Sequence, residues 1–199
     1  MRSTLLASVT AIAVLTATAA FAGDKRYDAG ASDTEIKIGQ TMPYSGPASG
    51  YGVNGKVEAA YWRMINSKGG INGRKITLLS MDDGYSPPKT LEQTRRLVEQ
   101  DDVLAIIGAL GTPTNSAIHK YLRSKKVPQL LITSGASKWN DPKDFPWATP
   151  FYPPYEQEAR IYGKYVAKEM PSAKIAVIYQ NDDFGKDYLR GFKEGLGDK

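Results

Sequence analysis

The chain of 199 residues contains no cysteine and only one histidine, His119. Without cysteine it can form no disulfide scaffold, no cysteine-ligated zinc or iron–sulfur site and no cysteine nucleophile. It also lacks the cysteine at which a lipoprotein is cleaved and anchored, so we expect no lipid anchor. A single histidine on an expected helix, with no acid near it in sequence, is more typical of a packing or surface residue than of a catalytic base. The sequence therefore predicts no metal site, no cofactor and no catalytic residue.

Long apolar runs are absent after the first 22 residues. At the start, Arg2 precedes an apolar run over residues 5–20, and Ala20-Phe21-Ala22 fits the small-x-small rule for signal cleavage. A transmembrane anchor would need a longer apolar run, of about 20 residues, with a basic flank after it. We therefore expect residues 1–22 to be a signal peptide, residues 23–33 a flexible mature N-terminus, and the mature chain to be exported.

Basic and acidic residues are interspersed along the chain, with no long run of one sign. The chain has 26 lysines and arginines against 21 aspartates and glutamates, a formal charge of +5. The longest basic cluster, at residues 123–126, falls at the end of an expected helix, where it complements the helix dipole. Because no nucleic-acid-binding motif is present, we expect no nucleic-acid partner.

The mature sequence alternates between strand and helix patterns. Residues 35–41, 75–81, 103–107 and 129–133 predict strands, the last two buried on both faces as in a parallel sheet. Helical spacing of apolar residues separates them, for example at 57, 60, 61, 64 and 65, and Ser86 and Thr112 are expected to cap the next two helices. This order predicts an α/β fold, an open parallel sheet with helices on both faces.

The remaining sequence predicts a second, shorter unit. Residues 134–154 read as a long connecting segment rich in proline and aromatic residues. A helix over 155–169, a strand over 174–179 and a helix over 186–196 are expected to follow it.

Short enzyme motifs match only in part. A Gly-x-Gly-x-x-Gly pattern at residues 50–55 is separated from the preceding strand by a proline-containing loop, unlike a dinucleotide-binding turn. The Ser-x-x-Lys pattern at 86–89 lacks the companion motifs of serine acylases. The acidic pairs at 82–83 and 182–183 lack the spacing of a calcium loop, which favours turn and cap roles.

Three loops that follow expected strands share one composition. Residues 43–52, 108–114 and 134–137 offer hydroxyls, backbone N–H groups, a helix start and aromatic rings, but no acid, base or metal ligand. Ligands of open α/β sheets bind at this edge, where N–H groups at a helix start suit a carboxylate or phosphate. Taken singly, each loop is equally typical of an ordinary Gly/Ser turn. Together they predict a site that holds a small molecule without reacting with it.

Five separated segments carry a resemblance to a known family: IKIGQTMPYSGPASGYG, NSKGGINGRKITLLSMDDGYSP, AIIGALGTPTN, VPQLLITSGAS and KIAVIYQNDDFGKDYLRGF. In this order the chain resembles the periplasmic solute-binding proteins of ABC importers, of the leucine/isoleucine/valine-binding group. The resemblance implies a type I periplasmic-binding fold, whose two lobes close over a ligand by hinge motion. It implies a complete first lobe over residues 34–150 and the start of an incomplete second lobe over 151–199.

The resemblance also implies which residues hold the ligand. By motif, Thr112 and Ser137 would bind a ligand carboxylate through hydroxyl and N–H groups. Gly135 and Ala136 would present backbone groups to the carboxylate and ammonium.

Three further positions bear on the ligand's identity. Tyr51 matches the aromatic residue that packs on the ligand side chain, Tyr155 falls where amino-acid binders often place an acid, and Phe184 replaces a frequent tyrosine. These departures make an aromatic carboxylate an alternative to a branched-chain or related amino acid.

The function implied by the resemblance is transport without catalysis. A monomeric receptor would capture the solute between its lobes and deliver it to the membrane permease of an ABC importer. The sensory domain of a receptor is an alternative, and an exported NAD-dependent or hydrolytic enzyme a less favoured one.

Overall fold

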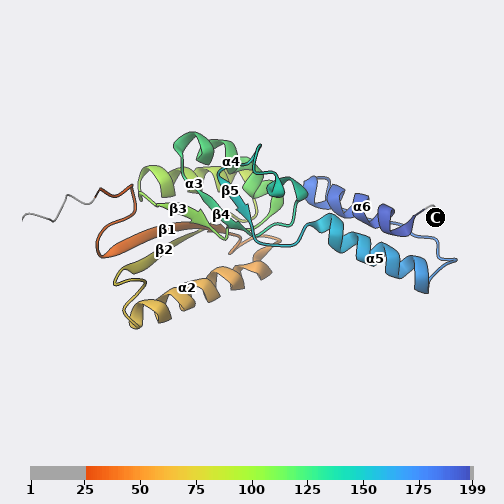
Figure 1. Cartoon of the computed structure of the whole chain (residues 1–199), viewed down its shortest axis with the longest axis horizontal. Coiled ribbons are helices and arrows are strands. Elements are labelled where there is room, and N and C mark those ends of the chain that lie inside the picture. Colours follow the sequence, from red (N-terminus) through yellow and green to blue (C-terminus); the bar gives the residue numbers. More distant parts are fainter. Residues whose placement is uncertain (1–25, 198–199) are drawn as a thin grey trace, which may run out of the picture.

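The computed structural model describes residues 26–197, so the predicted signal peptide lies outside the described residues. The fold is built on one sheet of five parallel strands in the order β2-β1-β3-β4-β5 (Figure 1). The strands are β1 (Glu35–Met42), β2 (Lys75–Asp82), β3 (Ala105–Ile107), β4 (Gln129–Ile132) and β5 (Ala148–Pro150). The predicted parallel α/β sheet is therefore confirmed, although β3 is shorter than expected.

Helices cover both faces of this sheet, as predicted. Neighbouring residues of a strand point to opposite faces. In β1, a Cβ on Gly39 would contact Leu97 of α3 (Pro87–Glu99), whereas Gln40 donates a hydrogen bond to Glu58 of α2 (Gly52–Ser67). The helix α4 (Thr112–Lys125) packs beside α3, so that α3 and α4 share one face and α2 lies on the other (Figure 1).

The main hydrophobic core lies between the sheet and the helices α3 and α4. Its buried members are Leu97, Val103, Ile106, Ala109, Ile118 and Leu122. Burying such aliphatic side chains stabilises the fold by about 1.5–3 kcal/mol each. This core holds the strands in position, so that their carboxyl ends form a firm edge.

The helix α2 turns its apolar stripe away from the sheet. Val57, Tyr61 and Met64 are exposed, whereas Glu58 points inward and meets Gln40. Burial raises the pKa of the Glu58 carboxyl. The predicted helix is confirmed, but its contact with the sheet is largely polar.

The segment at 134–154, expected to be a connection, adds structure to the sheet edge. It contains the 3₁₀ helix η3 (Ser137–Asn140) and the strand β5, which pairs with β4. The pairing is irregular between Gln129 and Ile132, and Leu131 lies half exposed with a φ of +52°. The prediction of a fully buried strand at 129–133 is thus wrong at Leu131, because the backbone leaves the extended conformation there.

A pair of helices, α5 (Tyr155–Glu169) and α6 (Asp183–Leu196), extends away from the sheet (Figure 1). A Cβ on Gly163 would lie 2.9 Å from the Cα of Gly195, so only glycines permit this close approach. The helix α6 begins three residues before the predicted position, because Asp182 caps it by accepting the N–H of Gly185 at 3.1 Å.

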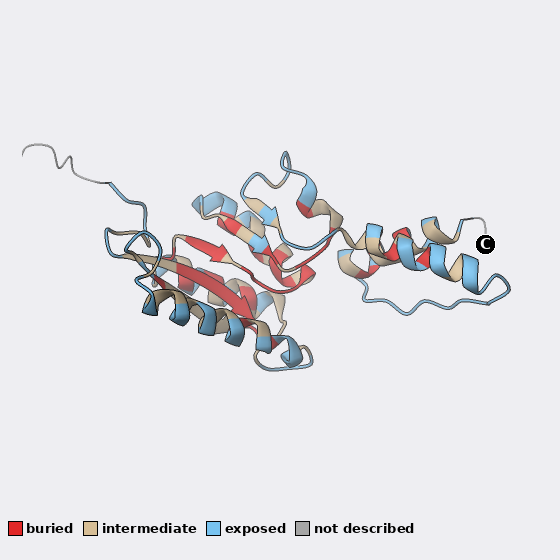
Figure 2. Cartoon of the chain, turned by 60° about the horizontal axis from the view of Figure 1, so that its bottom comes forward, coloured by how far each residue is buried: buried red, intermediate tan, exposed pale blue. Residues whose placement is uncertain are grey.

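The prediction of a strand at 174–179 is wrong. Residues 173–180 connect α5 to α6 as an extended segment without regular structure (Figure 2). Ile178 is fully exposed and Ile175, Val177 and Tyr179 are also exposed. A strand needs a neighbouring strand to satisfy its N–H and C=O groups, and none of the described strands lies beside this segment.

None of the helices within residues 26–197 is long and apolar enough to cross a membrane.

Candidate ligand-binding site

A cavity of about 790 Å³ lies where the carboxyl ends of the strands face α5 and α6. Each of the five strands of the sheet is followed within a few residues by a lining residue. The lining consists of Pro47, Ala48, Tyr51, Tyr85, Leu110, Thr112, Thr133, Tyr152, Pro153, Tyr155, Glu158, Gln180, Phe184 and Tyr188. The cavity thus sits at the edge where open α/β sheets bind ligands.

Aromatic rings dominate the walls of this cavity. On the helix side, Tyr155, Phe184 and Tyr188 form a mutual cluster with ring centroids 4.9–5.2 Å apart. On the sheet side the wall is completed by Tyr51, Tyr85 and Tyr152. Such walls suit a ligand with an apolar or planar part.

Three of the cavity tyrosines, Tyr85, Tyr152 and Tyr188, keep their hydroxyl protons at neutral pH. Burial raises the pKa of Tyr85 and of Tyr152 above the ordinary value for tyrosine. Burial and a hydrogen bond to Glu158 raise the pKa of Tyr188 further. These hydroxyls therefore remain neutral hydrogen-bond donors.

Asp82, at the end of β2, anchors the loop that carries Tyr51. Its Oδ1 accepts the N–H groups of Tyr44 (2.9 Å), Ser45 (3.0 Å) and Gly84 (3.0 Å). The Ser45 hydroxyl donates to Oδ2 at 2.6 Å and holds the pKa of Asp82 well below its usual range. The turn role predicted for Asp82 is confirmed.

Thr112 is the first residue of α4, not its cap. The N-cap residue is Gly111, which has a φ of +103°. No side chain makes a capping hydrogen bond to this helix. Ser86 does occupy the N-cap position of α3, but its side chain makes no capping hydrogen bond. The predicted capping bonds are therefore wrong for both residues, and the Thr112 hydroxyl is left for another role.

The hydrogen bonds made by Ser134 determine whether the Thr112 hydroxyl acts as donor or acceptor between the two residues. The Ser134 Oγ accepts two N–H groups, from Ala136 and from the Trp139 indole, both at 3.2 Å. With both lone pairs used, Ser134 donates its own hydrogen to Thr112 Oγ1, 2.7 Å away. Thr112 therefore has its hydrogen free to donate, next to the positive end of the α4 dipole. This arrangement suits a carboxylate in the cavity.

Glu158 places a carboxylate in the cavity wall from outside the three loops predicted to hold the ligand. It lies in the first turn of α5 and accepts hydrogen bonds from Tyr162 (2.7 Å) and Tyr188 (2.6 Å). The three loops contain no acid, as the sequence shows, and reasoning confined to them missed this residue.

The structure brings together four of the seven residues predicted to hold the ligand. Tyr51, Thr112, Tyr155 and Phe184 line the cavity. The other three, Gly135, Ala136 and Ser137, are not among its lining residues. The backbone C=O of Gly135 accepts the N–H of Tyr155 at 2.7 Å, and Ala136 is fully buried.

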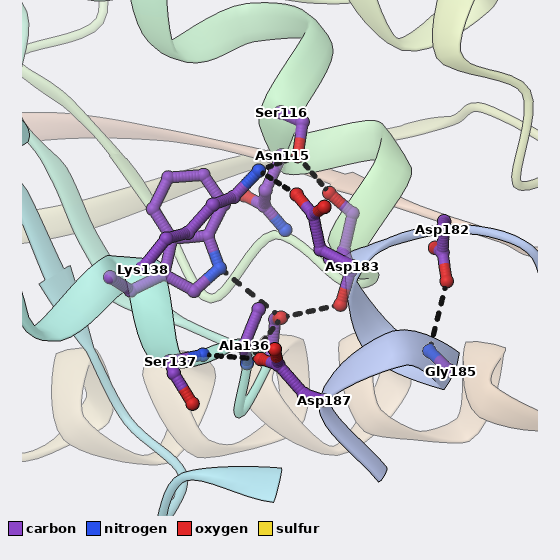
Figure 3. A network of polar contacts seen from close by, with 12 residues as sticks. Asn115, Ser116, Ala136, Ser137, Lys138, Asp182, Asp183, Gly185 and Asp187 are labelled. Carbon is purple, nitrogen blue, oxygen red and sulfur yellow. Dashed lines mark hydrogen bonds and ion pairs between the residues drawn. The ribbon is translucent and has the colours of Figure 1, made fainter. Parts of the chain in front are cut away.

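A polar network at η3 explains why Ser137 does not face the cavity (Figure 3). The N–H of Ser137 donates to Asp187 of α6 at 2.7 Å. Asp187 is 6% exposed, and burial raises its pKa. Lys138 joins the same two elements through Asp183 (2.7 Å) and reaches α4 through Ser116 (2.6 Å). An internal carboxylate thus occupies the N–H group predicted to bind the ligand.

Metal ligation is not supported by the part of the chain that the structure describes. Within residues 26–197, no group of three or more His, Asp or Glu side chains is placed to hold an ion. His119 packs against the rings of Phe145 and Trp139, with centroids 4.9 and 6.1 Å away. Its predicted packing role is confirmed.

Comparisons with known proteins agree with this geometry. Residues 35–199 match the family model described as periplasmic binding protein. The Leu/Ile/Val-binding protein homolog 3 of Brucella melitensis is 27% identical over 171 residues, covering 84% of this chain and 45% of that protein.

Solved structures show the same fold. A substrate-binding periplasmic protein from Ralstonia solanacearum superposes with a TM-score of 0.72 and 26% identity, covering 81% of this chain and 45% of that one. A solute-binding protein of an ABC transporter from Rhodopseudomonas palustris BisB5, in complex with 3,4-dihydroxybenzoic acid, superposes with a TM-score of 0.68 and 24% identity. The match covers 81% of this chain and 44% of that one. The chain spans about half the length of the curated relatives it matches. These relatives are substrate-binding proteins and not enzymes, and the chain belongs to the periplasmic binding protein family.

Proposed function

We propose that the protein is an extracytoplasmic receptor that holds a small carboxylate-bearing solute in the cavity between the sheet edge and α5 and α6. The observation that carries this proposal is the position of Thr112, which lines the cavity at the start of α4, where no side chain caps the helix. Residues 34–150 form the first lobe of this receptor, and residues 151–199 belong to the second.

The energetics favour an anion at this position. A hydrogen bond to a charged group contributes about 1.5–3 kcal/mol, and the helix dipole adds about 0.3–1 kcal/mol. The cavity of about 790 Å³ has room for a solute larger than the smallest amino acids. Its aromatic walls accommodate either a branched or a planar side chain.

Two ligand classes fit this description. A relative in sequence is named as a Leu/Ile/Val-binding protein, and a neighbour in fold holds an aromatic acid. Both kinds of solute carry a carboxylate. Tyr51, Thr112, Tyr155 and Phe184 are the residues we assign to contact with the ligand. Ser137 would contribute its N–H only if α6 moved away from η3.

A thermal-shift and calorimetry panel of amino acids and aromatic acids tests the proposal. A ligand at 100 times its Kd stabilises the folded protein by about 2.7 kcal/mol, which raises the melting temperature. Thr112→Val should weaken binding about 10–100-fold by removing the donor, whereas Thr112→Ser keeps the hydroxyl and most of the affinity. If no carboxylate raises the melting temperature, or if Thr112→Val binds as tightly as the wild type, the proposal fails.

The receptor would act as a monomer that presents its solute to the permease of an ABC importer. Because the family is periplasmic, residues 1–22 should be removed on export. N-terminal sequencing of protein recovered from the periplasm tests this, and a mature chain that retains residue 1 would contradict it. Cross-linking in membranes containing the permease tests the partner.

A further inference from the structure

The helix α2 makes polar contacts on the side that faces the sheet. Gln40 of β1 donates to Glu58 at 2.5 Å, and the Asn66 amide makes two hydrogen bonds with the backbone of Ile76, at 2.7 and 2.8 Å. The fully buried residues of α2 are both glycines. A helix that packs on a sheet usually buries an apolar stripe there. The amphipathic pattern of α2 is therefore largely reversed.

The opposite side of α2 carries the larger part of its apolar residues. Their spacing of three and four residues puts them on one face, which we call the outer stripe: Val53, Val57, Ala60, Tyr61 and Met64. Val57 is 61% exposed and Met64 is 43% exposed. Figure 2 shows that α2 is exposed along the side turned away from the sheet. Single exposed apolar residues are common, but a continuous row over about three turns marks an interaction surface.

Basic side chains flank the outer stripe. Lys56, Arg63 and the C-cap residue Lys68 are all exposed. None of the three takes part in an ion pair formed within residues 26–197. The one acid of the helix, Glu58, is turned toward Gln40. The outer side of α2 thus presents three positive charges that no acid of the same helix compensates.

This combination of apolar and basic residues is unsuited to pairing with a second copy of the chain. Two copies packed through their outer stripes would bring six positive charges together without an acid between them. A protein partner is also poorly served by the size of the surface. One face of this 16-residue helix covers roughly 240 Å², whereas a stable interface buries about 800 Å² on each partner.

A bilayer with anionic lipids matches the same features. Apolar side chains of an interfacial helix enter the boundary between headgroups and acyl chains, while lysine and arginine meet the lipid phosphates. Tyr61 suits this boundary, because its ring is apolar and its hydroxyl can stay at the level of the headgroups. A flat lipid surface needs no shape complementarity beyond one exposed helix face.

From these features we propose that the outer side of α2 docks the protein on the surface of an anionic lipid bilayer. This surface is separate from the solute cavity, because none of the outer-stripe residues lines the cavity. The lining residue nearest to it in sequence, Tyr51, precedes the helix. Docking would hold the receptor at the membrane with its cavity still accessible.

Co-sedimentation with large unilamellar vesicles tests the proposal. The protein is recovered from the periplasm, and N-terminal sequencing establishes whether the apolar run at residues 5–20 is absent. Wild-type protein should bind vesicles of equal parts phosphatidylglycerol and phosphatidylcholine about tenfold or more tightly than vesicles of phosphatidylcholine alone. This preference should shrink in about 0.5 M salt, which screens surface charges.

A first pair of variants tests the charges. Lys56→Gln with Arg63→Gln should weaken binding to the anionic vesicles about 10–30-fold, because each basic residue near such a surface contributes about fivefold. Lys120→Gln with Lys164→Gln removes the same net charge from exposed positions on α4 and α5 and should leave binding within about twofold.

A second pair of variants tests the outer stripe. Val57→Gln with Met64→Gln should weaken binding to the anionic vesicles about tenfold or more, because two side chains no longer enter the apolar boundary. Ile161→Gln with Tyr165→Gln changes two exposed apolar residues of α5 instead and should have little effect.

The outcomes decide between lipid and other occupants of this surface. Equal binding to both kinds of vesicle, or binding to neither, overturns the proposal, as does an equal loss in the α2 variants and their controls. A dimer in sedimentation velocity that Val57→Gln with Met64→Gln disrupts would assign the outer stripe to a second copy. Binding of soluble polyglutamate as tight as that of the vesicles would assign it to an acidic polypeptide.

Folding of the variants does not limit the test. All the substitutions change exposed or partly exposed side chains, so melting temperatures should stay close to that of the wild type. Should one variant not fold, the comparison of the two lipids and the remaining variants still decides. Should residues 1–22 be retained, the variants still decide, because all of them share that segment.

Discussion

Replacing either of two adjacent aspartates at the end of β2 by asparagine should change the stability of the fold, but in different directions: Asp82→Asn should lower it, and Asp83→Asn should leave it unchanged or raise it. The first is Asp82, whose Oδ1 accepts three backbone N–H groups. Its Oδ2 accepts the Ser45 hydroxyl at 2.6 Å and the Lys89 ammonium at 3.0 Å. Asp82→Asn keeps an acceptor for the N–H groups but presents an amide donor to Ser45 and Lys89. The bond to Lys89 is therefore lost, and Ser45 keeps a bond only as the acceptor of a neutral amide N–H.

The cost of Asp82→Asn can be worked from these contacts. A Ser45 bond to the charged carboxylate is worth about 1.5–3 kcal/mol and a neutral bond about 0.5–1.5 kcal/mol, so the exchange costs about 1–1.5 kcal/mol. The Lys89 pair is partly exposed, with 41% of the lysine side chain and 32% of the Asp82 side chain accessible, so its loss adds about 0–1 kcal/mol. The expected destabilisation is about 1–2.5 kcal/mol, or about 2–10 °C in melting temperature for a chain of this size.

The pH dependence of Asp82 follows from its lowered pKa. A carboxyl whose pKa lies below its unfolded value stabilises the fold above about pH 4, and this contribution is lost as the pH falls toward the folded value. The difference between wild type and Asp82→Asn should therefore be full at pH 7 and shrink below about pH 4.

The neighbouring Asp83 is fully buried, and burial raises its pKa. Its oxygens accept the N–H of Tyr85 and the hydroxyl of Thr90, both at 2.9 Å. In Asp83→Asn the amide oxygen can still accept from Tyr85, while the NH₂ donates to Thr90, whose own hydrogen goes to the C=O of Ser86 2.9 Å away. All bonds are then satisfied without a buried charge.

Asp83→Asn should consequently be neutral or stabilising at pH 7. A raised pKa means that the charged carboxylate costs stability at neutral pH, and that this cost disappears on acidification. The asparagine removes the cost at all pH values, so its advantage should be greatest above the folded pKa of Asp83.

Circular dichroism melts of the wild type and both variants at pH 7 and at pH 3 measure both effects. Equal destabilisation by the two substitutions at pH 7 would refute the reasoning, because it would mean that the charge of each aspartate, and not its particular bonds, matters. If the loss of stability caused by Asp82→Asn is the same at pH 7 and at pH 3, the lowered pKa assigned to the Asp82 carboxyl is refuted.

Three further substitutions probe the packing around the site. Gly111→Ala should lower the melting temperature and weaken ligand binding, because φ is +103° there and the new Cβ would collide with the Tyr85 ring in the cavity wall. Leu97→Ala should reduce the free energy of unfolding in a urea titration by about 2–5 kcal/mol, since Leu97 is fully buried in the core. Ile178→Ser should change that free energy by less than about 0.5 kcal/mol, because the side chain is fully exposed, and a larger loss would show that residues 173–180 pack in solution.

The sheet could be predicted from sequence because β1 and β2 carry β-branched residues typical of strands, and the helices between them require parallel pairing. The prediction failed at 174–179, where an apolar run typical of a buried strand has no neighbouring strand to pair with among the described residues. It also missed β5, because Ala148–Pro150 has only three residues and includes proline. Whether a segment forms a strand depends on the strands available to pair with it as well as on its own residues. The local sequence pattern contains information only on its own residues.

The cavity was predicted in part for a similar reason. Thr112 and Tyr51 lie in loops that follow strands, so the topology alone brings them to the sheet edge. Glu158 reaches the cavity because it lies near the start of α5, where the helix begins beside that edge. Ser137 sits where the pattern predicts, but Asp187 arrives from 50 residues away and takes its N–H group. Contacts of this range follow from tertiary packing, which no local pattern contains.

The contacts between η3 and α6 also determine how the two walls of the cavity are spaced. Glu158 and Thr112 lie on different sides, and the helix pair joins the sheet through residues 151–154 and the network at η3 (Figure 3). Lys138–Asp183 in that network is partly exposed, so breaking it costs little. The Ser137–Asp187 bond is more buried, and its acceptor is a carboxylate that also accepts from Arg190. Breaking a buried bond to a charged group costs more than breaking an exposed ion pair, so the Ser137–Asp187 bond contributes most of the resistance to a change in the spacing of the two walls.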